Sequence, residues 1–211
     1  MKTRYYIAAL IALSLLSLAI IGVRPVRGAG EPTPGVARVS LVHGEVTTMR
    51  GDSGDWVEAT VNAPVVQGDK ISTGDRSQTE IQLDYANVIR LAPRTEARIA
   101  DLTRTQIQVQ VAQGLINLTV LKGSEADVEI DTPNVAVRPL KEGTYRIQVR
   151  SESETLVIVR KGEAEVSTPK GSTLVRKGEL ITVRGIDEPE YQIAKAPKKD
   201  EWDEWNHDRD N

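Results

Sequence analysis

The sequence predicts an all-β protein of many short antiparallel strands, arranged as a twisted β-solenoid or a sandwich, with an N-terminal apolar helix and a short C-terminal helix. From residue 36 to residue 193 apolar and polar residues alternate with a period of two, and no window shows a helical apolar stripe. Val, Ile and Thr fill the alternating runs, and Gly, Pro and Asp separate them at intervals of about ten residues. Because solenoids and sandwiches share this period, both architectures stay open.

Residues 1–30 are predicted to be a signal peptide or a membrane anchor. Lys2 and Arg4 precede an uncharged apolar stretch, Tyr5–Val23, and the small residues 28–30 are typical of a signal-peptidase site. The stretch is long for a signal peptide, so an uncleaved inner-membrane tether through Tyr5–Val23 is the alternative. In both cases the basic N-terminus stays inside and the body is exported, to the periplasm or outside the cell.

Residues 31–35 are predicted to be a flexible lead, and residues 36–193 the β domain. The first two alternating runs flank His43 and Gly44, which indicates a hairpin. In the run 105–111 the residues Ile107, Val109 and Val111 are expected to face the core. The predicted strands cover residues 37–42, 45–49, 79–84, 87–92, 105–111, 115–121, 126–131, 134–137, 143–150, 155–160, 164–167, 172–176 and 180–184.

A glycine followed by an acidic residue recurs where strands begin, at Gly44, Gly68, Gly162 and Gly178. The spacings are irregular, so the phrase is not a structural repeat. Each of these glycines is expected to supply a positive φ at a tight turn.

Residues 194–211 are predicted to be a charged tail that contains a short helix. Asp200 can cap this helix, and Trp202 and Trp205 share one of its faces. Two tryptophans on a solvated helix must dock on a surface. The favoured surface is the protein's own sheet, with the helix covering an open edge, and the alternative is a partner protein. A metal held by Asp203 and His207 is disfavoured.

The composition excludes several classes of site. There is no Cys, hence no thiolate chemistry or cysteine metal site. The net charge is −3, and without residues 1–28, which hold four basic and no acidic residues, it is −7, so no nucleic-acid partner is expected. His43 and His207 are the two His residues, and neither has a catalytic setting, so the protein is predicted not to be an enzyme and to need no cofactor or metal. Trp56 is expected to be a core anchor, with a binding role as the alternative.

The segment Gly68–Glu96, which opens Gly-Asp-Lys-Ile-Ser-Thr and ends Ile-Arg-Leu-Ala-Pro-Arg-Thr-Glu, resembles the core motif of FecR domains. Segments 131–137, 142–149, 159–166 and 176–180 resemble the later strands of that family, so the resemblance spans residues 36–186. It implies an extracytoplasmic all-β domain similar to a twisted solenoid. In FecR-type regulators this domain receives a signal from an outer-membrane receptor and passes it to a cytoplasmic anti-sigma segment.

Only Met1–Arg4 precede the apolar stretch, so the expected role is the outer sensing or docking role alone. The tail 199–210 resembles a Trp- and Asp-rich segment that follows FecR-like domains in some secreted envelope proteins. The predicted function is therefore a non-catalytic module for protein interaction or signal sensing at the bacterial envelope, with an envelope or membrane protein as partner. Trp202, Trp205 and Trp56 are the candidate contact residues. The alternative is a secreted carbohydrate- or cell-wall-binding protein.

Overall fold

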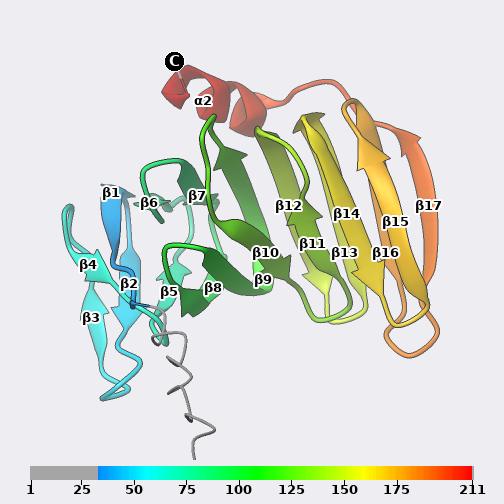
Figure 1. Cartoon of the computed structure of the whole chain (residues 1–211). Coiled ribbons are helices and arrows are strands. Elements are labelled where there is room, and N and C mark those ends of the chain that lie inside the picture. The colour runs from blue at the N-terminus through cyan, green and yellow to red at the C-terminus, as the bar shows by residue number, and fades with distance from the viewer. Residues whose placement is uncertain (1–32, 211) are drawn as a thin grey trace, which may run out of the picture. The chain divides into compact units, whose positions relative to one another are not determined.

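The computed structural model describes residues 33–210, which belong to one compact unit. The predicted signal peptide or anchor, with Tyr5–Val23 and the N-terminal helix, lies outside the described residues. Within 33–210 no helix is both long and apolar enough to cross a membrane. The all-β prediction is confirmed, because this part of the chain folds into 17 strands and one short C-terminal helix, α2 (Glu201–Arg209) (Figure 1).

The strands form two layers that share one long strand, β9 (Gln106–Val120). The first layer has the order β4–β1–β6–β7–β9–β12–β13–β16–β17, with β4 Pro64–Val65, β1 Ala37–His43, β6 Gln78–Gln82, β7 Asn87–Leu91, β12 Gly143–Ser151, β13 Glu154–Lys161, β16 Glu179–Arg184 and β17 Glu190–Lys195. The second has the order β3–β2–β5–β8–β9–β10–β11–β14–β15, with β3 Trp56–Glu58, β2 Val46–Met49, β5 Lys70–Thr73, β8 Glu96–Leu102, β10 Asp127–Asp131, β11 Ala136–Pro139, β14 Glu163–Thr168 and β15 Gly171–Arg176. All pairings are antiparallel except β9 with β10.

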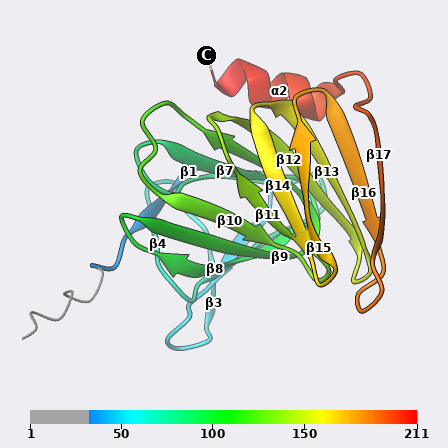
Figure 2. The ribbon, with the colours of Figure 1, turned by 45° about the vertical axis from the view of Figure 1, so that its right-hand side comes forward.

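The fold combines features of the solenoid and of the sandwich, the two architectures that the sequence pattern could not distinguish. After β9 the hairpins β10–β11, β12–β13, β14–β15 and β16–β17 are placed alternately in the second and the first layer (Figure 2). The alternation advances the chain along one direction, as in a solenoid, while each layer remains an antiparallel sheet of a sandwich.

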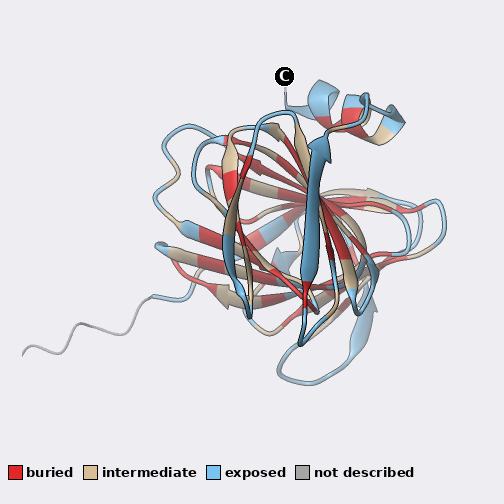
Figure 3. Cartoon of the chain, turned by 90° about the vertical axis from the view of Figure 1, so that its right-hand side faces the viewer, coloured by how far each residue is buried: buried red, intermediate tan, exposed pale blue. Residues whose placement is uncertain are grey.

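A single hydrophobic core fills the space between the layers. Ile107, Val109 and Val111 of β9 are buried in it, as the alternation predicts, and Ile116 and Leu118 enter it from the other half of the same strand. The core is built almost entirely from aliphatic side chains, with Tyr145 as its one large aromatic residue among those described. Figure 3 shows this buried interior and the exposed strand β17 at one end of the first layer.

Two predictions about the strands are wrong. β1 and β2 do not form a hairpin: β1 pairs with β4 and β6, and β2 with β3 and β5, so the chain passes between layers at His43 and Gly44. The runs 105–111 and 115–121 are not separate strands but parts of β9. Gly114, with φ +96°, lies where β9 leaves one layer and enters the other, and a Cβ there would overlap Thr95.

The turn glycines behave as predicted. Gly44, Gly68, Gly162 and Gly178 all have positive φ, between +74° and +95°. The last residue of the predicted lead is already attached to the domain, because the Gly35 amide donates to the Leu102 carbonyl at 2.7 Å.

Candidate interaction site at the C-terminal helix

Helix α2 begins where the sequence predicts. Asp200 is its N-cap, and the Asp203 amide donates to Asp200 Oδ1 at 3.0 Å while the Asp200 amide donates to Asp203 Oδ2 at 3.2 Å. This reciprocal capping box satisfies two amides that would otherwise lack partners. Acidic residues in the first turn and Arg209 in the last suit the helix dipole.

The helix lies on the outer face of the first layer, over strands that are interior to that layer. It contacts β6, β7, β9, β12 and β13, so the predicted docking on the protein's own sheet is confirmed (Figure 1). The expected position at an open edge is wrong, because these strands are paired on both sides. The docking surface is a row of four residues that face one another across neighbouring strands: Glu80, Arg90, Asn117 and Arg146.

At the N-terminal end of α2, Asp203 joins the helix to the sheet. Arg146 Nη1 donates to Asp203 Oδ2 at 2.9 Å, and Arg160 approaches the same carboxylate through Nη2 at 2.5 Å and Nε at 3.2 Å. Asp203 is 5% exposed, so this is a buried carboxylate held by two guanidinium groups. Arg160 Nη1 also donates to the Pro197 carbonyl at 2.7 Å, which fixes the chain just before the helix.

At the C-terminal end, Arg90 and Glu80 form the second junction. Arg90 is 3% exposed and contacts Glu80 at 2.6 Å, Asp210 at 2.8 Å and the Asn206 carbonyl at 3.2 Å. Arg209 closes the network with bonds of 2.8 and 2.9 Å to the two Glu80 oxygens.

Burial would raise the pKa of Glu80, but the hydrogen bonds from Arg209, Arg90 and Ser40 outweigh it and lower the pKa from 4.5 to about 2. Glu80 is therefore ionised at neutral pH and serves as an anchor for both arginines.

The two tail tryptophans share a face as predicted. Their rings stack with centroids 5.0 Å apart and planes at 21°. Arg90 and Arg209 lie 6.0 and 5.7 Å from the Trp205 ring centroid, within cation–π range. Both tryptophans are only partly buried, whereas Asp203 and Asn206 are the buried residues of the helix. Polar groups therefore hold α2 on the sheet, and the Trp pair remains partly accessible.

Trp56 lies elsewhere. It is 50% exposed on β3, the end strand of the second layer, so the expectation that it anchors the core is wrong. The reason is the position of β3, which pairs only with β2 and exposes all three of its residues. The structure thus brings Trp202 and Trp205 together on α2 and leaves Trp56 on β3, and Figure 1 shows these two elements well apart.

The sheet residues that receive the helix were not found by sequence reasoning. Arg90, Arg146 and Arg160 stand at outward positions of predicted strands, where charged residues are ordinary. Their role in binding α2 depends on the strand register, which places them side by side under the helix, and the sequence of each strand alone does not show it.

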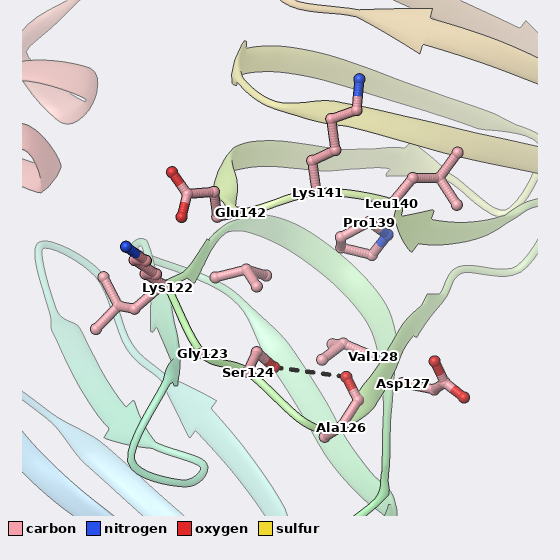
Figure 4. Close-up of a pocket in the computed structure, with 12 residues that line it drawn as sticks. Lys122, Gly123, Ser124, Ala126, Asp127, Val128, Pro139, Leu140, Lys141 and Glu142 are labelled. Atoms are coloured by element: carbon pink, nitrogen blue, oxygen red, sulfur yellow. Dashed lines mark hydrogen bonds between the residues drawn. The ribbon is translucent and has the colours of Figure 1, made fainter.

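A hollow lies between the β9–β10 and β11–β12 connections. It has a volume of about 320 Å³ and is lined by exposed Leu121 and Leu140, with Lys122, Lys141 and Glu142 at its rim (Figure 4). Ser124 Oγ donates to the Ala126 carbonyl at 3.5 Å within the first connection. The charged groups point apart in Figure 4 and do not converge on one point. Within residues 33–210 no group of three or more His, Asp or Glu residues could hold a metal ion.

Comparisons with known proteins show what the chain is similar to. Two crystal structures of a candidate anti-sigma factor from Parabacteroides distasonis ATCC 8503 have a similar fold, each with a TM-score of 0.52, 20% sequence identity and coverage of 60% of this chain and 59% of that chain. The match thus spans less than two thirds of those structures, and at this identity it concerns the fold. No curated protein matches the chain significantly. The family model described as FecR protein matches residues 69–165, which hold nearly all of the Gly68–Glu96 motif and strands β5–β13. The resemblance to FecR domains is confirmed over residues 69–165, which match this family model.

Proposed function

We propose that this chain is a non-catalytic module that works outside the cytoplasm of a bacterial cell and takes part in signal sensing by binding an envelope protein. The observation that carries the proposal is the docking of α2, with its partly accessible Trp pair, on the central strands of a FecR domain. A contact made at this helix would act directly on β7, β9 and β12, the middle of the first layer.

The chemistry of the surface indicates the kind of partner. The outward residues Glu201, Glu204 and Asp208 are exposed and acidic, and they border the stacked rings of Trp202 and Trp205. A partner that combines basic side chains with an apolar or cationic group for the rings would complement this surface.

The carboxyls that hold α2 do not have the raised pKa that a general acid needs, whereas burial raises the pKa of Asp131 on β10. The Glu80 pKa is lowered, because hydrogen bonds from Arg209 and Arg90 outweigh the opposing effect of burial. The Asp200 pKa is also lowered, because hydrogen bonds from Arg146 and Asp203 outweigh the opposing effect of burial. These groups serve to hold α2 in place.

The partner role is tested by capture from bacterial envelope extracts with the full chain as bait. We expect one or more envelope proteins to be enriched with the wild-type chain, to be lost with the double variant Trp202→Ala/Trp205→Ala, and to be retained with Trp56→Ala. Reciprocal capture with the identified protein completes the test. If no envelope protein is enriched above an unrelated exported β domain, or if the double variant captures the same proteins, the proposed role at α2 is wrong.

Export rests on the sequence of residues 1–30 and is tested by the intact mass of the protein isolated from its native cells. A mass that lacks residues 1–28 or 1–30 supports cleavage and release. A mass that includes Tyr5–Val23, together with membrane fractionation, supports the tether. Recovery in the cytoplasmic fraction would contradict both.

A cell-wall-binding role is the second candidate, and exposed Trp56 on the end strand β3 favours it. Exposed aromatic rings are suitable platforms for sugar rings. Sedimentation with purified peptidoglycan tests this role: co-sedimentation that Trp56→Ala abolishes would support it, and a chain that remains in the supernatant would exclude it.

A further inference from the structure

A cavity of about 230 Å³ lies between α2 and strands β9, β12 and β13. A water molecule occupies roughly 30 Å³ in the liquid, so a single bound water does not fill this space. The volume is also below the roughly 300–1,000 Å³ of sites for drug-sized ligands, which limits an occupant to a small molecule.

Asn117 of β9 lines this cavity and is 1% exposed. Neither its amide oxygen nor its amide nitrogen has a hydrogen-bond partner among the residues that the structure describes. Its neighbours across the strands, Arg90 and Arg146, form ion pairs with Asp210 and with Asp203 of α2. A buried amide with two unsatisfied groups is costly, and a hydroxyl group can satisfy both, since it accepts from Nδ2 and donates to Oδ1.

The charges around the cavity favour an anion. Lys161, Lys177 and Lys199 line it together with Arg160, against the carboxylates of Asp203 and Asp210. Both carboxylates are already paired, Asp203 with two arginines and Asp210 with Arg90. Within residues 33–210 no ion pair is formed by Lys177 or Lys199, so the two exposed ammonium groups at this site are available to a ligand.

We propose that this cavity binds a small anion that also carries hydroxyl groups, with Asn117 as the hydroxyl-binding residue and Lys177 and Lys199 as the anion-binding residues. Because α2 covers the Asn117 amide, contact with it requires the helix to move slightly outward, so that binding alters the surroundings of the Trp pair. The site is separate from the protein contact proposed above, and either can exist without the other.

Isothermal titration calorimetry of the full chain tests the site with two matched pairs of probes: glucuronate with glucose, and glycerol 3-phosphate with glycerol. We expect at least one anion to bind with a Kd of about 1 mM or tighter and to change the tryptophan fluorescence, with its neutral counterpart at least about tenfold weaker. The absence of binding by both anions, or equal binding by a neutral counterpart, would overturn the proposal. Neither outcome bears on protein capture, which uses no added small molecule.

Variants identify the residues. Asn117→Leu keeps the size of the side chain and removes both unsatisfied groups, so we expect an unchanged or higher Tm together with at least about tenfold weaker binding of the anion. The double variant Lys177→Ala/Lys199→Ala should weaken binding of the anion and reduce the salt dependence of that binding. Lys122 is an exposed lysine elsewhere, so Lys122→Ala should change neither the affinity nor its salt dependence. If Asn117→Leu binds the anion with wild-type affinity, the anion binds elsewhere and the proposed site is wrong.

Discussion

Glu80 is the residue at which the network under α2 is most sensitive to pH. Its pKa is lowered from 4.5 to about 2 in the folded protein, so its contribution to stability is present above the unfolded pKa and is lost as pH falls from about 4.5 through 2. Glu80→Gln keeps the shape but removes the charge that Arg90 and Arg209 share. We expect it to lower the free energy of unfolding at pH 7 by on the order of 2 kcal/mol.

The measurement is urea unfolding of both proteins at several pH values. The difference between wild type and Glu80→Gln should be constant from pH 6 to 8 and should shrink as the pH falls below about 4.5. A difference that stays the same down to pH 2.5 would show that the charge of Glu80 does not stabilise the fold.

At Gly143 a larger residue is excluded by lack of space and not by an unfavourable φ. A Cβ at position 143 would overlap the Lys161 carbonyl, where β12 is paired with β13. Gly123, by contrast, has φ +86° and open space around it. We expect Gly143→Ala to cost more than about 2 kcal/mol through displaced backbone, and Gly123→Ala about 1 kcal/mol through the unfavourable φ. Equal losses in thermal unfolding would contradict the assignment of different causes.

At the scale of an element, α2 depends on one buried carboxylate. Asp203→Ala removes half of the capping box and leaves Arg146 and Arg160 without their shared partner. We expect a loss of about 3 kcal/mol, of which the cap supplies about 1 kcal/mol. Glu204→Ala changes an exposed residue of the same turn and should cost less than about 0.5 kcal/mol. Chemical denaturation followed by tryptophan fluorescence compares the two, and similar midpoints would mean that α2 contributes little to the fold.

The elements also show how far the sequence alone leads. Strand alternation and the Asp200 cap are local, and they locate most strands and the start of α2. β8 was not predicted, because a bulge between Ile99 and Asp101 breaks the alternation of buried and exposed residues. The β1–β2 hairpin was wrong because a glycine turn has the same sequence whether the next strand pairs with the last one or enters the opposite layer. The row from Glu80 to Arg146 depends on the register of four strands, and no local pattern encodes it.

At the scale of the whole described unit, β9 makes the two layers one hydrogen-bonded system. Its first half pairs with β8 and β10, and its second half with β7 and β12. Each layer has two edge strands, which pair on one side only. They are β4 and β17 in the first layer and β3 and β15 in the second. Stability should therefore be greatest around β9 and decrease toward these ends. A contact at α2, placed over the central strands, acts on the most stable part of the unit.

This arrangement predicts that both layers unfold together. Ile107 lies in the half of β9 that belongs to the second layer, Ile116 in the half that belongs to the first, and both are fully buried. Each change to Ala should cost about 2–5 kcal/mol, whereas Leu121→Ala, at an exposed position, should cost less than about 1 kcal/mol. In a Trp56→Phe background the fluorescence comes from α2 on the first layer alone, and circular dichroism reports all strands. We expect Ile107→Ala to lower the urea midpoints of both signals equally, because a single cooperative transition has one midpoint. If the fluorescence midpoint stays at its original value while the circular dichroism midpoint falls, the layers unfold independently and β9 does not couple them.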